Sequence, residues 1–272
     1  MHEKERHRII LSAIQGKPVA TVQEMVELTD SSEATIRRDI ATLHVQKKLR
    51  RVRGGAESIS PPQFVGLAGR PFSVNETINM AQKRAIAVKA AELCDDGDPI
   101  IINGGTTTFQ MVHPLAMKRC QVFTNSFPIA EHLLKHSKNT ITLSGGTIYR
   151  EQNIILSPFD NDVTRNFYAK RMFMGAQGLS PLGLMEADPL LIQAEQKLIN
   201  QADELVVLVD ASKLKKRSSL ILCPLSRITK VITDDGIDDK SAAMLEAAGI
   251  ELIIAERGRG AARVSPEPLA AG

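Results

Sequence analysis

The sequence predicts an α/β protein with two domains, a small helical one at the N-terminus and a larger one built on a mainly parallel sheet. Two observations lead to this expectation. In the first 57 residues, three short helical patterns precede a basic hairpin with two adjacent glycines. After residue 98, short apolar segments recur, each followed by a turn and several by a helical pattern, as in sheets buried on both faces. A chain of 272 residues that is 43% hydrophobic can form both cores.

The N-terminal helical patterns are short and close together. The first covers residues 6–14. The second is expected to begin after Thr21, because Glu24 follows three residues later and completes a capping box. The third opens on a serine, and Ile36, Ile40 and Leu43 recur along it at helical spacing, so that one stripe faces a core. Three helices of this kind are typical of a helix-turn-helix.

A basic hairpin completes this unit. Residues 49–56 read as two short strands that return at Gly54-Gly55. From Arg37 to Arg53 there are seven basic residues and one acid, Asp39, a local net charge of +6 in a chain whose net charge is only +3. A helix with outward arginines beside a basic hairpin suits duplex DNA, because the helix fits the major groove and the cations meet phosphates. The residues expected to contact DNA are Ser32, Thr35, Arg37, Arg38, Arg50, Arg51 and Arg53.

The same pattern is open to a second interpretation. A small three-helix unit with an arginine pair can dock another protein, and charge runs are often solvated faces. The tight turn, the capped third helix and the glycine-terminated hairpin all favour the DNA-binding interpretation. We therefore expect a winged helix-turn-helix over residues 1–57.

The composition changes after residue 57. Residues 58–74 are rich in Pro, Gly and Ser without periodicity and are expected to be a linker. A long helical pattern over 75–93 opens the second domain, which is expected to end at 255. The tail over 256–272 is expected to be disordered.

The second domain repeats a strand–turn pattern. The expected strands cover 99–103, 121–123, 140–143, 170–174, 204–209, 230–233 and 251–254, and the expected helices cover 109–117, 128–135 and 239–248. Ligands of such sheets bind beyond the carboxyl ends of the strands, near a switch in strand order. Here these ends carry Gly-Gly-Thr-Thr-Thr (104–108), Thr-Asn-Ser (124–126) and Ser-Gly-Gly (144–146).

These loops have the chemistry of a sugar-phosphate site. Glycines let the backbone approach an anion, and hydroxyls donate hydrogen bonds. A single Gly-Gly after a strand is usually a tight turn, so the repetition at successive strand ends carries the prediction. Lys197 and Lys213 are expected anion partners, and residues 183–188 place two carboxylates in a loop where they either bind sugar hydroxyls or cap the next helix. The expected effector residues are Gly104, Gly105, Thr106, Thr107, Asn125, Ser126, Gly145, Gly146, Glu186, Lys197 and Lys213.

Several function classes are disfavoured. There is neither a GxGxxG nor a GxxxxGK[ST] motif, which argues against a dinucleotide or nucleoside triphosphate, and we expect no cofactor. The six histidines form no HExxH site, and His132 and His136, which are at i, i+4 spacing, have no Cys or carboxylate arrangement nearby, so we expect no metal. The three cysteines, Cys94, Cys120 and Cys223, are expected to be reduced thiols. No apolar run is long enough to span a membrane, and we expect a cytoplasmic protein.

Together these motifs resemble the DeoR family of bacterial transcriptional repressors. The resemblance rests on Ala34–Ile40, the Leu49–Ala56 hairpin, the three glycine- or hydroxyl-rich loops and Asp210-Ala211-Ser212-Lys213, and it covers about residues 5–255. It implies a sensor domain similar to ribose-5-phosphate isomerase, a sugar-catabolism operon repressed until a phosphorylated sugar binds, and a homo-dimer or tetramer. The sensor most resembles those of rhamnose-catabolism and ascorbate-utilisation repressors. Asn103 departs from the family, since many members have Asp there, and residues 183–188 depart from its common Gly-Leu-Thr pattern.

A rival interpretation is an enzyme, a sugar-phosphate isomerase or lactonase with an accessory DNA-binding domain. Isomerisation needs a general base beside the substrate carbon. Glu186, Asp188 and Glu195 are the plausible bases near the loops. The repressor interpretation is favoured, and an activator remains an alternative within it.

Overall fold

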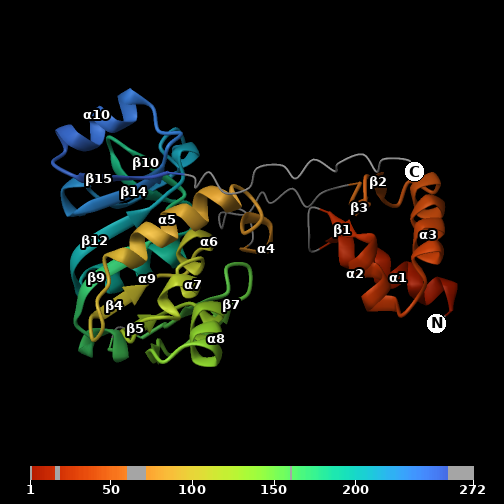
Figure 1. The fold of residues 1–272 in the computed structure, drawn as a ribbon, viewed down its shortest axis with the longest axis horizontal. Helices are drawn as coiled ribbons and strands as arrows, with labels where there is room; N and C mark the ends of the chain where they lie inside the picture. The colour runs from red at the N-terminus through yellow and green to blue at the C-terminus, as the bar shows by residue number, and fades with distance from the viewer. Residues whose placement is uncertain (1, 16–18, 60–71, 160, 257–272) are drawn as a thin grey trace, which may run out of the picture. The chain divides into compact units, whose positions relative to one another are not determined.

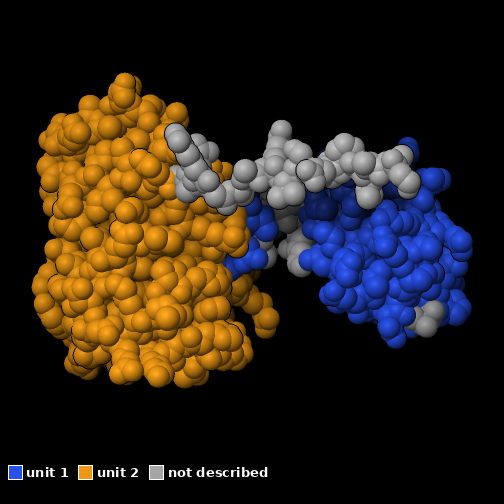
Figure 2. Space-filling view, viewed as in Figure 1, with its two compact units in different colours: residues 1–78 blue, residues 79–272 orange. Residues whose placement is uncertain are grey.

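The computed structural model describes residues 2–15, 19–59, 72–159 and 161–256. The chain divides into two compact units, residues 1–78 and 79–272 (Figure 2). The expected linker over 58–74 differs at its end, because Phe72–Asn75 forms a short helix, α4. Most of the expected linker, and the expected tail apart from Glu256, lie outside the described residues.

The first unit is a three-helix core with a small sheet (Figure 1). Its sheet has the order β1-β3-β2, and both pairings are antiparallel. Side chains from all three helices pack together with Leu49 and Ala56 of the hairpin. The elements are α1 (Glu3–Gln15), β1 (Ala20–Thr21), α2 (Val22–Thr29), α3 (Glu33–Val45), β2 (Arg50–Val52) and β3 (Gly55–Glu57).

Two local predictions for this unit are confirmed. The Thr21 hydroxyl accepts the Glu24 N–H while the Glu24 carboxylate accepts the Thr21 N–H, so the capping box is complete. Asp30 ends α2 in the left-handed region, with φ of 47°, and so turns the chain into α3. Ile36, Ile40 and Leu43 are buried, as their helical spacing predicts.

The second unit is built on a seven-stranded sheet with the order β15-β14-β12-β9-β4-β5-β6, in which every pairing is parallel. The chain runs outward from β4 to β5 and β6, then returns to β9 on the other side of β4. The strand order therefore reverses between β4 and β9. The sheet strands are β4 (Pro99–Ile102), β5 (Gln121–Thr124), β6 (Thr140–Leu143), β9 (Ala169–Met174), β12 (Ala202–Leu208), β14 (Lys230–Asp234) and β15 (Glu251–Ala255).

Helices cover both faces of this sheet, which explains why its central strands are apolar except near their ends. One buried cluster joins the sheet to α5, α7 and α8. The other joins it to α9, α10 and a small antiparallel sheet of order β10-β11-β13. The covering elements are α5 (Met80–Glu92), α6 (Thr106–Phe109), α7 (Val112–Leu115), α8 (Phe127–His136), β10 (Gly178–Ser180), β11 (Gly183–Glu186), α9 (Pro189–Ile199), β13 (Leu220–Cys223) and α10 (Asp239–Ala247).

Several expected elements differ from the structure. The helix expected over 75–93 begins only at Met80, because Asn79 is in the left-handed region with φ of 53°. The helix expected over 109–117 is two short helices, α6 and α7. The loop expected over 183–188 is largely strand β11, whose Glu186 ends it. The hairpin of β7 (Thr147–Tyr149) and β8 (Ile154–Leu156) was not expected, nor were the 3-10 turns η1 (Val163–Asn166), η2 (Ala211–Lys213) and η3 (Leu225–Arg227).

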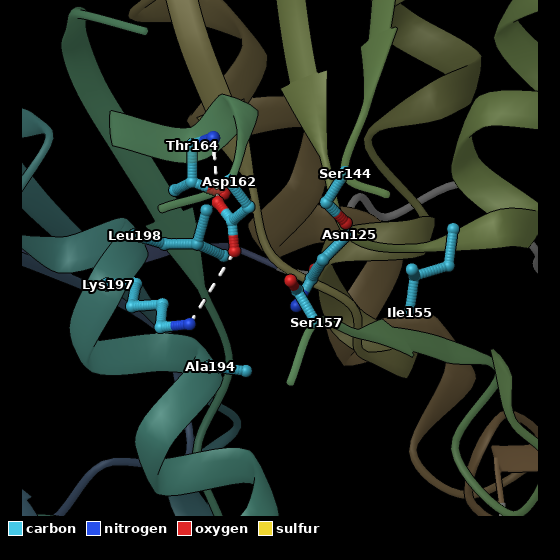
Figure 3. A pocket seen from close by; sticks show the side chains of 9 residues that line it. All are labelled: Asn125, Ser144, Ile155, Ser157, Asp162, Thr164, Ala194, Lys197 and Leu198. Carbon is cyan, nitrogen blue, oxygen red and sulfur yellow. Dashed lines mark hydrogen bonds and ion pairs between the residues drawn. The ribbon is translucent and has the colours of Figure 1, made fainter. Parts of the chain in front are cut away.

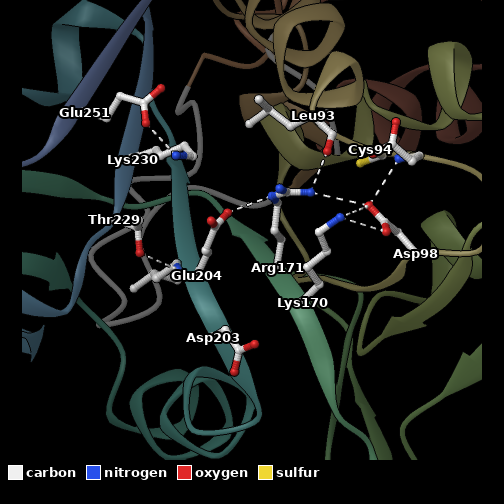
Figure 4. Close-up of polar contacts among 12 residues, drawn as sticks. Leu93, Cys94, Asp98, Lys170, Arg171, Asp203, Glu204, Thr229, Lys230 and Glu251 are labelled. Atoms are coloured by element: carbon white, nitrogen blue, oxygen red, sulfur yellow. Dashed lines mark hydrogen bonds and ion pairs between the residues drawn. The ribbon is translucent and has the colours of Figure 1, made fainter.

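Charged side chains at the amino-terminal edge of the large sheet are paired with one another (Figure 4). The Arg171 guanidinium donates to Glu204 Oε2 at 2.7 Å and to the Leu93 carbonyl at 2.6 Å, and it lies 3.4 Å from Asp98 Oδ2. Lys170 Nζ donates to Asp98 Oδ1 at 3.0 Å. Burial alone would raise the pKa of Asp98, but the hydrogen bond from Lys170 and the nearby Arg171 hold it below its ordinary value. This network fixes the start of β4, β9 and β12.

Candidate functional site

The third helix presents most of its polar residues away from the core. Ser32 caps α3, since its hydroxyl accepts the Thr35 N–H at 3.2 Å and lies 2.8 Å from the Thr35 hydroxyl. Because Ile36 and Ile40 are buried, Arg37 and Arg38 fall on the exposed face. Arg37 forms an i,i+4 ion pair with Glu33.

The hairpin differs by one residue from the expected return. Val52 pairs with Gly55, so the turn is Arg53-Gly54, and Gly54 has φ of 83°. Gly55 is needed for a different reason, because a Cβ there would lie 2.1 Å from the Ala20 carbonyl oxygen of β1. The side chains of Arg37, Arg51 and Arg53 line a surface hollow between α3 and this hairpin.

The arginines of this surface differ in their partners. Arg50 pairs across the hairpin with Glu57. Arg38, Arg51 and Arg53 are exposed and have no acidic partner within the described ranges of the chain. Unpaired exposed guanidinium groups are available to phosphates and base edges.

The sequence did not predict the structural role of one residue of this helix. Asp39, counted only as a charge in the sequence, is buried on the inner side of α3. Its carboxylate accepts from Arg6 Nη2 at 3.2 Å and lies 3.2 Å from His7 Nε2, both on α1. Burial would raise the pKa of Asp39, but the Arg6 and His7 hydrogen bonds bring it below its ordinary value. We call these three residues the Asp39 clamp. It fixes α3 against α1.

The expected effector loops lie at the carboxyl edge of the large sheet, beside the reversal of strand order. The Gly104 N–H, after β4, donates to Asn125 Oδ1, after β5, at 2.8 Å. A surface hollow there is lined by Asn125 and Ser144 on one side and by Asp162 and Lys197 on the other (Figure 3). Lys197 donates to the Phe159 carbonyl at 2.6 Å and lies 3.6 Å from Asp162 Oδ2.

Two side chains of this hollow have polar atoms without a partner. Asn125 Nδ2 and Ser144 Oγ are buried and form no hydrogen bond with any described residue. The orientation of the Asn125 amide is fixed, because its oxygen accepts the Gly104 N–H. A buried polar atom without a partner costs free energy unless a ligand or water supplies one. Both atoms are therefore positioned to bind a ligand or a water.

The other expected loop residues have varied positions. Thr107 and Ser126 are buried, while Gly105 and Thr106 are half-buried at the start of α6. Gly145 is exposed, and neither it nor Gly146 lines the hollow. Gly146 instead lies against β8, where a Cβ would be 2.2 Å from the Leu156 carbonyl oxygen. Of the loop over 144–146, Ser144 lines the hollow, and Ser144 was not among the expected effector residues.

A cluster of buried carboxyl groups lies on β11 and α9 and in the turn between them. Glu195 of α9 accepts from Asn103 Nδ2 at 2.8 Å, and Glu195 Oε2 and Asn103 Oδ1 have no partner among the described residues. Burial, then the charge of Glu186, raises the pKa of Glu195 well above its ordinary value. Burial also raises the pKa of Glu186 to about 7, although the Ala187 N–H and the charge of Lys213 oppose this rise. Asp188 caps α9 through the Leu190 N–H at 2.9 Å, the capping role left open in the sequence.

The two lysines that were expected to bind the effector, Lys197 and Lys213, lie at different places along this edge. Lys213 Nζ lies 3.4 Å from Gln177 Oε1 and close enough to Glu186 to act on its charge. Lys197 lines the hollow with Asn125. Asn103 precedes Gly104 directly, and Glu195 follows the hollow-lining Ala194, so both residues of this hydrogen-bonded pair are next in sequence to residues of the carboxyl edge.

The described ranges contain no group of three or more His, Cys, Asp or Glu side chains arranged to hold a metal ion. Within the same ranges, no helix has the length and apolar character needed to cross a membrane. The three cysteines are buried free thiols.

Two family models match the chain. The DeoR-like helix-turn-helix domain matches residues 6–62, and the DeoR C terminal sensor domain matches residues 78–235. The HTH-type transcriptional regulator UlaR of Shigella dysenteriae is 33% identical over 256 residues, which are 93% of this chain and 99% of that protein. UlaR of Escherichia coli K12 has the same identity and coverage.

Solved structures also resemble parts of the chain. A ribose 5-phosphate isomerase A from Methanocaldococcus jannaschii has a TM-score of 0.38 and 20% identity, over 50% of this chain and 54% of that one. A transcriptional regulator from Streptococcus pneumoniae has a TM-score of 0.37 and 10% identity, over 61% of this chain and 86% of that one.

Proposed function

Because the chain belongs to the DeoR family of DNA-binding transcriptional regulators, we propose that it represses a sugar-catabolism operon and leaves its operator when a phosphorylated sugar binds at the carboxyl edge of the large sheet. The observation that carries the proposal is a pair of surfaces: among the described residues, exposed arginines on the first unit have no acidic partner, and buried polar atoms on the second have no hydrogen-bond partner. Each lacks what its ligand would supply.

The DNA-binding surface consists of the exposed face of α3 and the β2–β3 hairpin. Thr35, Arg37 and Arg38 meet base edges or phosphates in the major groove, and Arg51 and Arg53 add phosphate or minor-groove contacts. A homo-oligomer presents two such surfaces to two half-sites. Because its operator is chromosomal DNA, the proposed repressor acts in the cytoplasm.

The effector acts by differential affinity. It binds more tightly to a sensor arrangement in which the two DNA-binding surfaces no longer match the half-site spacing, and so it lowers operator affinity. The donors at the hollow, Asn125 Nδ2, Ser144 Oγ and Lys197 Nζ, suit phosphate oxygens. Neither a metal nor a cofactor is required.

A mobility shift on the promoter of the chain's own gene cluster tests this function. We expect a shift at moderate salt that one member of a panel of sugar phosphates abolishes. A shift that no member affects would leave DNA binding in place and contradict the effector proposal. A shift that appears only when a sugar phosphate is added would indicate an activator.

The recognition surface is tested by Arg37→Ala, which we expect to weaken operator binding roughly tenfold, since one good arginine contact to a base contributes about 1–3 kcal/mol. Lys135→Ala is the matched control, because Lys135 and Glu131 form a similar exposed i,i+4 pair on α8. Effector affinity should be unchanged in both. Equal operator affinity for Arg37→Ala and the wild type would mean that this face of α3 is not the DNA-binding surface.

The acidic cluster favours a second candidate function. A buried glutamate with a raised pKa beside a sugar-phosphate site can act as a general base, as an isomerase requires. The named relatives are transcriptional regulators, so we favour a protein without turnover. Incubation of each sugar phosphate with the purified protein, followed by NMR, distinguishes the two: conversion of a substrate that Glu195→Gln abolishes would establish the enzyme.

A further inference from the structure

The hollow at the carboxyl edge is lined by an anion of the protein itself. Asp162 is one of its lining residues, and Asp162 Oδ2 lies 3.6 Å from Lys197 Nζ (Figure 3). The other oxygen of this carboxylate accepts the Thr164 N–H at 2.9 Å and so caps η1. The Asp162 and Lys197 side chains are 10% and 18% exposed, so the ion pair is largely shielded from solvent. It joins η1 to α9 on one side of the hollow.

The Asp162 carboxylate is ionised near neutral pH. Burial would raise its pKa, but hydrogen bonds with Thr164 and Ser157 and the charge of Lys197 hold the pKa of Asp162 below its ordinary value. Among the described residues that line the hollow, Asp162 is the acid and Lys197 is the base. The cation expected to bind the effector's phosphate is thus already paired with a carboxylate.

A phosphate group and a carboxylate compete for the same donors. Both present oxygens that accept hydrogen bonds, and both form charge-assisted pairs with a lysine. A phosphate bound by Asn125 and Ser144 would lie in the same hollow as Asp162, and like charges repel strongly where water is largely excluded. The hollow therefore favours one anion at a time.

We propose, on the basis of the sugar-phosphate function above, that Asp162 is an internal competitor of the effector, whose phosphate replaces the Asp162 carboxylate at Lys197. Asp162 thereby weakens effector binding and raises the effector concentration at which the repressor leaves its operator. The replacement breaks the ion pair between η1 and α9, so binding in the hollow changes the contact between these two elements. Asp162 is thus a determinant of effector affinity that acts through Lys197.

Asp162→Asn tests this competition. Asparagine keeps an oxygen that accepts the Thr164 N–H and caps a helix as well as aspartate does, but it carries no charge. Calorimetry on the full chain measures the affinity for inorganic phosphate. We expect a gain of roughly tenfold over the wild type, because a like charge is removed from a largely shielded site. Equal affinity, or no binding to either protein, would overturn the inference, as would weaker binding, which would mean that Asp162 helps to bind the anion.

Asp238→Asn is the matched control. Asp238 also caps a helix, since it accepts the Ser241 N–H at 2.8 Å, and it also pairs with a lysine, Lys215, at 3.3 Å. It caps α10 and does not line the hollow, so phosphate affinity should stay at the wild-type value. An equal gain in both variants would mean that the net charge of the chain governs binding, and it would overturn the inference. The same holds for a gain in Asp162→Asn that disappears at about 1 M salt, where the Debye length is about 3 Å.

Mobility shifts separate this inference from the proposed function. The sugar phosphate that releases the wild type from its operator should release Asp162→Asn at a roughly tenfold lower concentration, and Asp238→Asn at the wild-type concentration. Release of Asp162→Asn at the wild-type concentration would overturn the inference while the proposed function stands. If no sugar phosphate of the panel releases any of the three proteins, the proposed function fails and the inference fails with it.

Discussion

The two edges of the large sheet treat polar groups in opposite ways. At the amino-terminal edge, Arg171 is bound to two carboxylates and a carbonyl. At the carboxyl edge, Asn103, Asn125, Ser144 and Glu195 each keep a buried polar atom without a partner in the described chain. Both edges are made by the same strands, so the difference does not come from strand chemistry. We propose that it distinguishes groups that stabilise the fold from groups that are available to a ligand.

The largest expected effect comes from breaking the paired edge. Arg171→Ala leaves Asp98 and Glu204 without their shared partner and removes a hydrogen bond to the Leu93 carbonyl. The Arg171 and Asp98 side chains are 15% and 13% exposed, so solvent screens the loss little. We expect the free energy of unfolding to fall by about 3 kcal/mol, measured by urea denaturation.

The control for this variant is its neighbour. Lys170→Ala removes a partner of Asp98 that is 41% exposed, and it should cost less than half as much. Effector affinity should be the same in both variants and the wild type. A large loss of effector affinity with intact stability in Arg171→Ala would contradict the division between the edges.

The Asp39 clamp extends the comparison to the first unit. Asp39 is buried and paired with Arg6 and His7, whereas Arg38, one residue earlier on α3, is exposed and has no acidic partner among the described residues. We expect Asp39→Ala to lower the free energy of unfolding by about 2–3 kcal/mol, because it removes a buried carboxylate that pairs with both Arg6 and His7. Arg38→Ala should change stability by less than about 0.5 kcal/mol and weaken operator binding. Thermal melts and mobility shifts separate the two, and the reverse pattern would refute the assignment.

The sequence predicted those features that a periodic pattern of apolar residues indicates. It did not predict contacts between residues that are far apart in the sequence. Ile36 and Ile40 follow from helical spacing, and the apolar runs identified the strands of the large sheet. The short strands β10 and β11 were missed, since Gly178 and Gly183 interrupt any strand pattern, and β11 was expected to be a loop. The contact between Asp39 and Arg6 spans 33 residues, and no local pattern encodes it. The unpartnered state of Ser144 depends on what surrounds it in space.

The pH dependence of stability tests whether burial of the Glu186 carboxylate at the carboxyl edge lowers the free energy of unfolding of the free protein. The pKa of Glu186 in the folded chain is about 7, above the ordinary 4.5 expected when the chain is unfolded. The folded state therefore binds more protons between these values, and stability falls as pH rises from 4.5 through 7. We expect a loss of about 1–2 kcal/mol between pH 5 and 7 from this group, measured by urea denaturation at each pH.

Glu186→Gln removes the titrating group while keeping an oxygen for the Ala187 N–H, which Glu186 accepts at 2.7 Å. The fall in stability between pH 5 and 7 should become shallower, and the variant should exceed the wild type at pH 7. Glu204→Gln, at the paired edge, should leave the slope unchanged. An unchanged slope in Glu186→Gln would mean that Glu186 titrates normally in the folded protein.

We expect the smallest change in stability from Ser144→Ala. This variant is also the sharpest test of the difference between the two edges of the sheet. The Ser144 hydroxyl is buried without a partner in the described chain, so its removal takes away a desolvated group and breaks no hydrogen bond. We expect stability to change by less than about 0.5 kcal/mol, or to rise. The affinity for the releasing sugar phosphate should fall roughly tenfold, because a hydrogen bond to a charged ligand contributes about 1.5–3 kcal/mol. Ser212→Ala is the control, since the Ser212 hydroxyl already pairs with Asp210. If Ser144→Ala lost stability and kept its effector affinity, an unpartnered buried atom would no longer indicate a ligand site in this protein.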